Sequence, residues 1–175
     1  MGMTESQVAQ FNDTGYLSPL PVADEAKANT WRQQFDALEQ QEGKEKSQVG
    51  LHDRHFDQAF IWEIATSTAI LDAVEAVLGP DILLLASQFF CKYGEGEKFV
   101  AWHQDVTYWG LEPPFAITAW YAVDDSDREN GCMMVIPGTH AEGIQEHGKA
   151  DSAGNLLSIN QEVPVTEEEA IIFVN

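Results

Sequence analysis

Basic residues are scarce in this chain, which carries 9 Lys and Arg against 29 Asp and Glu, for a net charge of −20. A field of that sign repels phosphate backbones, so the charge excludes a role in nucleic-acid binding. It also disfavours anionic membranes and polyanionic ligands. We interpret the acidic excess as a well-solvated surface rather than as a functional feature, and we expect the partner to be a small molecule.

Cysteines and long apolar runs are also scarce. The two cysteines, Cys91 and Cys132, form neither a disulfide framework nor a Cys-rich zinc site. No apolar run reaches the roughly 20 residues of a membrane span. Residues 1–5 lack the basic segment and the apolar stretch of a signal peptide. These absences predict a cytoplasmic protein with no membrane partner.

Helical signals fill residues 1–80. Thr4-Glu5-Ser6-Gln7 is a capping box that predicts a helix ending near Gly15. Asp24 is the expected N-cap of a second helix, which is predicted to end near Gly43. Apolar side chains at helical spacing predict its buried face, and a third and fourth helix are expected at 56–66 and 68–78. The predicted inward residues are Trp31, Phe35 and Leu38 in the second helix and Leu71, Val74 and Leu78 in the fourth.

After Pro80 the helical period disappears and apolar or aromatic runs follow one another between turn signals. We expect one domain over 1–175, with a helical part at 1–80 and a β core at 81–175. Helices followed by strands predict a mainly β, α+β fold in which helices buttress a sheet or barrel. Residues 141–160 are expected to form a long loop over the site. The predicted strands are 82–93, 99–106, 116–123, 132–136, 161–165 and 170–174.

The segment His103-Gln104-Asp105 is the strongest chemical signal. Residues i and i+2 of a strand point to the same face, so one imidazole and one carboxylate can reach a single metal ion. They are two thirds of the 2-His-1-carboxylate triad, which leaves positions on Fe(II) open for a co-substrate and O₂. On pattern alone, a strand histidine beside a surface aspartate stays an equal alternative.

Several separated segments, in the same order, resemble the phytanoyl-CoA dioxygenase family. They are 69–84, 99–110, 118–125, 129–140 and 155–158, and the resemblance extends from about residue 48 to the end of the chain. The resemblance implies a double-stranded β-helix, a cupin-like jelly roll. It also implies an Fe(II)- and 2-oxoglutarate-dependent dioxygenase that uses O₂, with ascorbate as a reductant.

The resemblance also implies individual roles. His103 and Asp105 become the catalytic pair and two of the three iron ligands, and Asp105 favours hydroxylation over halogenation because its carboxylate fills the position that a halide needs. For the aromatic residues, ordinary packing stays an alternative. The implied co-substrate contacts are Gln88, Thr118 and Trp120, and the implied walls of the substrate pocket are Tyr108 and Trp109.

Family members have a third ligand, a later histidine, followed by an arginine that binds 2-oxoglutarate. The last histidines here, His140 and His147, are expected in a structural turn and a surface loop, and no arginine follows Arg128. We therefore expect both groups beyond Asn175, in a chain that is truncated at its C-terminus and inactive alone. The predicted function is hydroxylation of a small organic substrate. The alternatives are a truncated or degenerate non-catalytic jelly-roll binding protein and a cupin-like metal isomerase.

Overall fold

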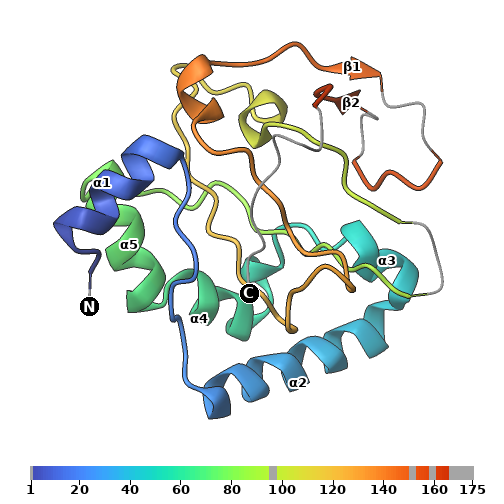
Figure 1. The fold of residues 1–175 in the computed structure, drawn as a ribbon. Coiled ribbons are helices and arrows are strands. Elements are labelled where there is room, and N and C mark those ends of the chain that lie inside the picture. The colour runs from blue at the N-terminus through green and yellow to red at the C-terminus, as the bar shows by residue number, and fades with distance from the viewer. Residues whose placement is uncertain (1, 95–97, 150–152, 158–160, 166–175) are drawn as a thin grey trace. The chain divides into compact units, whose positions relative to one another are not determined.

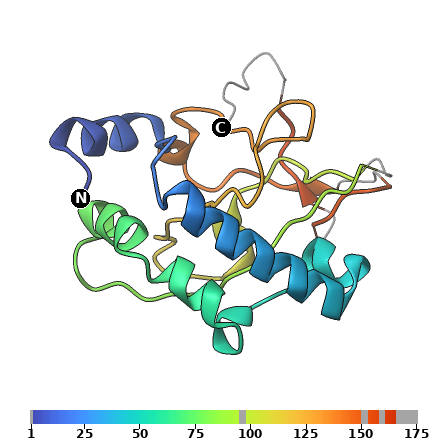
Figure 2. The same cartoon turned by 90° about the horizontal axis from the view of Figure 1, so that it is seen from below.

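The computed structural model describes residues 2–94, 98–149, 153–157 and 161–165 (Figure 1). Helices occupy the first half of the chain, and short elements occupy the second half. α2 is the longest element, at 18 residues, and is drawn in blue along most of its length in Figure 2. The elements are α1 (Glu5–Thr14), α2 (Glu25–Glu42), α3 (Lys44–Val49), η1 (Arg54–Phe56), α4 (Ala59–Ala65), α5 (Thr68–Leu78), η2 (Asp105–Tyr108), η3 (Thr139–Glu142), β1 (Gly148–Lys149) and β2 (Gln161–Glu162), where η marks a 3-10 helix.

The chain divides into two compact units, and neither is a continuous stretch. The first unit comprises Met1–Ala9, Pro19–Cys91 and Tyr121–Asp125, and the second comprises Gln10–Ser18, Lys92–Trp120 and Ser126–Asn175. Helices α2 to α5 belong to the first unit, and both strands belong to the second. The expectation of one domain with parts at 1–80 and 81–175 stays a prediction. In the described ranges, no helix is long and apolar enough to cross a membrane.

The first two helices begin where their caps predict. Thr4 and Gln7 form the reciprocal capping box: the Gln7 amide donates to Thr4 Oγ1 at 3.3 Å, and the Thr4 amide donates to Gln7 Oε1 at 2.9 Å. The Lys27 amide donates to Asp24 Oδ1 at 2.8 Å. Each bond satisfies a backbone N–H that the first turn leaves without a partner. The two predicted helix starts are therefore confirmed.

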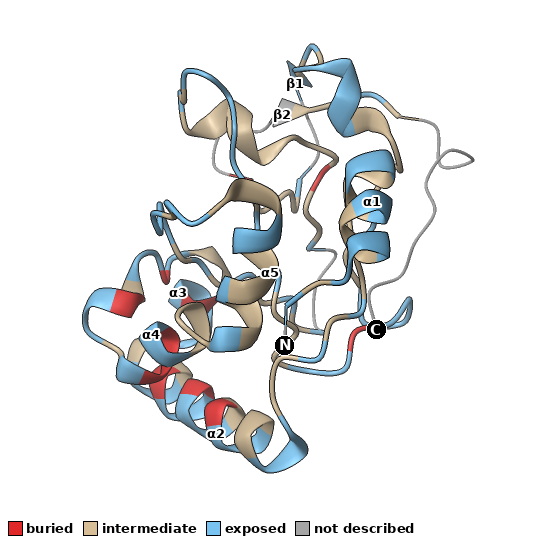
Figure 3. Ribbon diagram, turned by 90° about the vertical axis from the view of Figure 1, so that its left-hand side faces the viewer, coloured by how far each residue is buried: buried red, intermediate tan, exposed pale blue. Residues whose placement is uncertain are grey.

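The core of the first unit is built on one face of α2. The three residues predicted to face inward, Trp31, Phe35 and Leu38, are the buried residues of that helix, and α4 also carries buried positions (Figure 3). The Phe35 and Phe89 rings lie 4.8 Å apart, so Phe89, which follows α5 in the chain, packs against this cluster. The buried members are Trp31, Phe35, Leu38, Leu51, Phe60 and Ile61.

Three helical predictions need correction. Leu71 is 36% exposed and α5 has no buried residue, so the prediction that Leu71 faces a core is wrong. The third helix starts later than predicted, because η1 occupies Arg54–Phe56 and α4 begins at Ala59. Helix α3 was not predicted. It follows Gly43, whose φ of +85° favours glycine, and its polar sequence Lys44–Val49 has no apolar stripe that would identify it.

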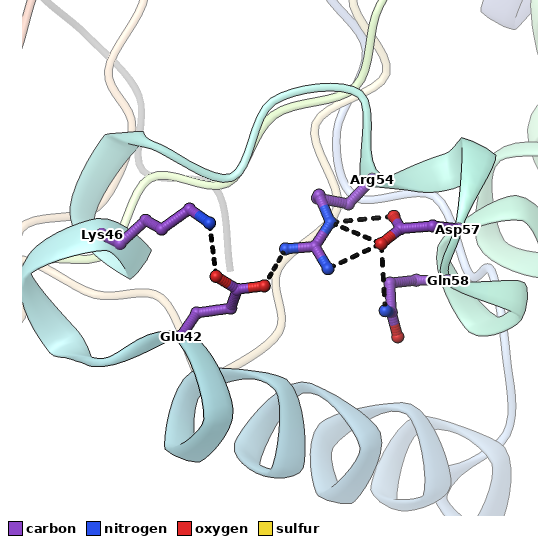
Figure 4. Close-up of polar contacts among 5 residues, drawn as sticks. All are labelled: Glu42, Lys46, Arg54, Asp57 and Gln58. Atoms are coloured by element: carbon purple, nitrogen blue, oxygen red, sulfur yellow. Dashed lines mark hydrogen bonds and ion pairs between the residues drawn. The ribbon is translucent and has the colours of Figure 1, made fainter.

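A cluster of charged side chains holds the junction of α2, α3 and η1 (Figure 4). Arg54 Nη1 lies 2.7 Å from Glu42 Oε1, and Arg54 Nη2 lies 2.7 Å from Asp57 Oδ2. Lys46 also pairs with Glu42. Hydrogen bonds from Lys46 and then Arg54 lower the pKa of Glu42, and the hydrogen bond from Arg54 lowers the pKa of Asp57. Both carboxylates therefore stabilise this junction in their charged form.

The strands are much shorter than predicted. β1 and β2 are two residues each and pair antiparallel, with Gly148 opposite Glu162. The prediction at 161–165 is therefore only partly confirmed, and the strand expected at 170–174 lies outside the described residues. Two isolated bridges join His52 to Gln88 and Phe99 to Asn155.

Among the described residues, the predicted strands at 82–93, 116–123 and 132–136 are not formed, and the segment predicted at 99–106 contains one bridge and the start of η2. The physical reason is hydrogen bonding: a strand requires a repeating ladder of backbone bonds. These segments make single contacts instead, such as the bond from the Cys91 amide to the Gln48 carbonyl. These segments are apolar, as the sequence analysis noted, but they do not form the backbone pairing that defines a strand.

Candidate metal centre

The predicted ligand pair comes together in the second unit. Gln104 has the extended angles φ −116° and ψ 121°, so the side chains on either side of it point the same way. His103 Nε2 consequently lies 3.0 Å from Asp105 Oδ1. The side chains of His103 and Asp105 are 21% and 41% exposed, so a small ligand can reach them. The local i, i+2 geometry is the predicted one, although it arises from one extended residue before η2 and not from a strand.

The imidazole of His103 is held in the tautomer that a metal ligand needs. Its Nδ1 atom lies 2.7 Å from the Ala101 carbonyl oxygen, which can only accept, so Nδ1 carries the proton. In the neutral ring, the lone pair is then on Nε2, which faces Asp105. Histidines that bind metals usually donate their second N–H to a carbonyl or carboxylate in this way. His103 therefore fits a divalent cation bound through Nε2.

Both carboxylate oxygens of Asp105 are also held by neighbouring side chains. Oδ1 faces His103, while the Thr118 hydroxyl donates to Oδ2 at 2.5 Å. Burial raises the pKa of Asp105, but the hydrogen bonds from His103 and Thr118 outweigh that effect, and the net pKa is lowered. Burial lowers the pKa of His103, but the Asp105 hydrogen bond, the Ala101 carbonyl and the Asp105 charge together raise it. Without a metal, each of the two groups therefore favours the charged form of the other.

Tyr108 brings an unsatisfied hydroxyl to the same region. Its Oη atom is shielded from solvent and has no hydrogen-bond partner among the described residues. The ring meets the His103 ring edge to face, with centroids 6.0 Å apart. Burial, followed by the charge of Asp105, raises the pKa of this phenol, which therefore stays protonated. A buried donor without a partner is costly, and an oxygen of a bound ligand would satisfy it.

The described part of the chain contains no group of three or more His, Cys, Asp or Glu side chains placed to hold a metal. Both ring nitrogens of His147 are in use, one beside the Gln145 carbonyl at 2.9 Å and the other accepting from the Gln104 amide at 3.2 Å. His140 Nε2 lies 3.1 Å from the Asn12 carbonyl, which agrees with the structural role expected for it. The third ligand and the arginine stay predictions.

The remaining predicted residues are placed as follows. Gln88 lies in the first unit, where its amide donates to the Val49 carbonyl at 3.2 Å. In the second unit, Trp109 is half-buried beside Tyr108 and Trp120 is 38% exposed. Thr118 contacts Asp105, a role that the sequence analysis missed. Its hydroxyl within the largely apolar run 115–123 was the available signal, since a polar group there needs a partner.

The comparisons with known proteins identify the class. The family described as phytanoyl-CoA dioxygenase (PhyH) matches residues 3–170. Because this match covers nearly the whole chain, the chain belongs to the phytanoyl-CoA dioxygenase family, and the predicted family resemblance is confirmed.

Among curated relatives, the chain is 34% identical over 91 residues to the peroxisomal phytanoyl-CoA dioxygenase of Bos taurus, covering 50% of the chain and 27% of that protein. It is 25% identical over 159 residues to the methylphosphonate hydroxylase of Gimesia maris, covering 81% of the chain and 59% of that protein. The match thus spans about a quarter of the bovine protein and somewhat more than half of the bacterial one.

The chain is similar in fold to a solved structure. It is described as CytC3 with Fe(II) and alpha-ketoglutarate, and it superposes with a TM-score of 0.59 at 22% identity. The superposition covers 91% of this chain and 65% of that one. This likeness supports the fold class expected from the sequence at the level of overall fold, while the described strands remain short.

Proposed function

We propose that this chain carries the His103–Asp105 part of the iron site of an Fe(II)- and 2-oxoglutarate-dependent oxygenase that hydroxylates a small organic substrate. The observation that carries the proposal is that His103 Nε2 and Asp105 Oδ1 lie 3.0 Å apart. The second polar atom of each side chain is hydrogen-bonded elsewhere, His103 Nδ1 to Ala101 and Asp105 Oδ2 to Thr118. A nitrogen and a carboxylate oxygen are the donors that a 2-His-1-carboxylate iron site uses. Membership of the phytanoyl-CoA dioxygenase family supports the same chemistry.

In this proposal, the residues divide the work of binding and orienting. His103 would hold Fe(II) through Nε2 and Asp105 through Oδ1, while Ala101 and Thr118 keep these atoms aimed at the ion. When bound, Fe(II) with 2-oxoglutarate supplies the activation of O₂ that oxidises the substrate. The Tyr108 hydroxyl would donate to an oxygen of the co-substrate or the substrate. The protein's own contribution is therefore position and partial shielding from water.

The finer assignments belong to the same proposal. A jelly-roll barrel is supported by the fold shared with the solved Fe(II)-containing protein. Thr118 and Trp120 are proposed as co-substrate contacts, and Trp109 as a wall of the substrate pocket beside Tyr108, while the contact of Gln88 with the co-substrate stays a prediction from the resemblance. Asp105 favours hydroxylation because its carboxylate occupies a position on the metal. The net charge of −20 favours a substrate with little negative charge over a polyanion such as an acyl-CoA.

Succinate formation from 2-oxoglutarate tests this function. A protein that carries this chain together with the predicted third ligand and arginine is supplied with Fe(II), O₂, ascorbate and 2-oxoglutarate, and succinate is measured for the wild type and for His103→Ala and Asp105→Ala. We expect succinate from the wild type and at least a hundredfold less from either variant, since each removes one protein ligand. His140→Ala is the matched control, because its ring bonds to Asn12 and not to the pair. Binding of 2-oxoglutarate without succinate would favour a non-catalytic binding protein instead.

A further inference from the structure

We propose that His147 is a positioning residue that holds the backbone of Gln104 in the conformation on which the His103–Asp105 pair depends. This inference rests on the proposed function, since it concerns how the same metal site is shaped. The segment around His147 is distant in sequence from the pair, and it was expected to be a loop. Three of its hydrogen bonds go to Gln104, the one residue that lies between the two ligands.

Gln104 is bonded at three points to residues 143–147. Its backbone N–H donates to His147 Nε2 at 3.2 Å, its side-chain amide donates to the Gly143 carbonyl at 3.0 Å, and its side-chain oxygen accepts from the Gln145 amide at 2.7 Å. Two of these bonds fix the side chain of Gln104. The bond to His147 holds the backbone N–H of Gln104, while its backbone carbonyl accepts from the Thr107 amide at 3.2 Å and from the Thr107 hydroxyl at 2.7 Å.

His147 is in the correct tautomer to accept that bond. Its Nδ1 atom lies 2.9 Å from the Gln145 carbonyl oxygen, so Nδ1 carries the proton and Nε2 has the free lone pair. The same short segment therefore fixes the ring of His147 and uses it to receive the Gln104 amide. A half-buried imidazole with both nitrogens satisfied has one preferred orientation.

The backbone of Gln104 matters because it sets the direction of both ligands. Its extended angles place the side chains of His103 and Asp105 on one side, and rotation of its φ or ψ would turn one away from the other. On the other side of His103, the Trp102 carbonyl accepts from the Val163 amide at 2.8 Å. The ligand segment is thus held before His103 by Val163 and after it by His147. Without His147, the Gln104 amide would lose its partner and the restraint on the pair would weaken.

A matched pair of variants tests this role. In His147→Gln, the side-chain amide extends to the position of Nε2, so it can still accept from the Gln104 N–H. In His147→Asn, the amide reaches only the position of Nδ1, so it can bond to Gln145 but not to Gln104. Both replacements are polar and neutral, and they differ by one methylene group. His140→Asn is the control, since it removes a histidine contact to Asn12 within the same unit.

The probe is Co(II), titrated into the metal-free chain and followed by its d–d absorption, with thermal unfolding recorded for each variant. We expect His147→Asn to bind Co(II) about 10- to 100-fold more weakly, with a changed absorption spectrum, as for other losses of support around metal ligands. His147→Gln is expected to restore affinity and spectrum, and His140→Asn to keep both. A purely structural role would lower the unfolding temperature of His147→Asn and leave its Co(II) affinity and spectrum unchanged.

The outcomes separate this inference from the proposed function. Equal Co(II) affinity in wild type and His147→Asn, or equal weakening in His147→Gln and His147→Asn, would overturn the positioning role. If His103→Ala abolished Co(II) binding in the same series, the metal site itself would stand. If the wild type bound Co(II) no better than His103→Ala did, the proposed metal site would fail, and the role of His147 would fail with it.

Discussion

The hydroxyl of Thr118 donates a 2.5 Å hydrogen bond to Oδ2 of Asp105, the carboxylate oxygen that does not face His103. The two residues are 13 positions apart in sequence and lie in the same unit. A carboxylate with both oxygens engaged cannot rotate freely about its last bond. Thr118 therefore determines which lone pairs of Asp105 are available to a metal ion.

We predict that Thr118→Val weakens Fe(II) binding about 10-fold, because valine has the shape of threonine without the hydroxyl. Thr118→Ser keeps the hydroxyl and is expected to bind Fe(II) close to the wild-type level. The measurement is an anaerobic Fe(II) titration of the three proteins. Unchanged affinity in Thr118→Val would show that Asp105 is oriented by something other than this bond.

Tyr108→Phe tests whether the phenol faces a ligand. The Tyr108 hydroxyl is buried without a partner among the described residues, so its removal is expected to cost no stability or to raise it slightly. If the hydroxyl donates to bound 2-oxoglutarate or substrate, Tyr108→Phe should bind that ligand about 5- to 10-fold more weakly. Fe(II) affinity should not change. A variant that binds Fe(II), 2-oxoglutarate and substrate as the wild type does would refute the ligand contact.

Leu51→Ala is expected to lower the free energy of unfolding by about 2–5 kcal/mol. Leu51 is 1% exposed and belongs to the apolar cluster packed on α2, so its truncation leaves a cavity inside that cluster. Leu83→Ala is the matched control, because Leu83 is 93% exposed. Urea denaturation of the two variants gives the comparison. Similar losses of unfolding free energy in both variants would mean that Leu51 does not belong to the core of the first unit.

The charged cluster in Figure 4 predicts an acid dependence of stability. Hydrogen bonds from Lys46 and Arg54 lower the folded-state pKa of Glu42 below its unfolded value. Its stabilising contribution is therefore complete above the ordinary carboxyl range and is lost as the pH falls through the lowered pKa. We expect Glu42→Gln to lower the unfolding temperature at neutral pH and to show less further loss on acidification than the wild type.

The control for the acid dependence is Glu45→Gln on α3, which replaces an exposed carboxylate outside this cluster. Its unfolding temperature is expected to follow the wild type across the pH range. If Glu42→Gln and the wild type lose stability in parallel between neutral pH and about pH 3, then the pairing of Glu42 does not contribute to the acid dependence.

The parts of the fold that depend on local signals could be predicted from the sequence. The caps at Thr4 and Asp24 and the stripe of Trp31, Phe35 and Leu38 depend on residues within one or two helical turns, and the structure confirms them. Strand pairing was not predictable in the same way, because a ladder depends on partners far along the chain. An apolar run such as 82–93 shows that a segment is suited to a sheet but not where its partner lies.

In the candidate site, too, the features set by neighbouring residues were predictable and those set by distant contacts were not. The pair His103 and Asp105 was found from its spacing, since one extended residue is enough to bring the two side chains together. The contacts that orient the pair come from Thr118 and His147, which are 13 and 43 positions from their partners. Such contacts depend on the fold, so the sequence analysis assigned Thr118 another role and placed His147 in a surface loop.

The most direct test of the central claim is the Fe(II) stoichiometry of the chain, measured anaerobically by equilibrium dialysis in enough salt to suppress weak binding to the acidic surface. The wild type is compared with His103→Ala, Asp105→Ala and the double variant. If the two side chains share one ion, the wild type binds one Fe(II), and both single variants lose it almost as completely as the double variant does. Retention of the same Fe(II) affinity by Asp105→Ala or His103→Ala would contradict the account, because the pair would then not be the metal site.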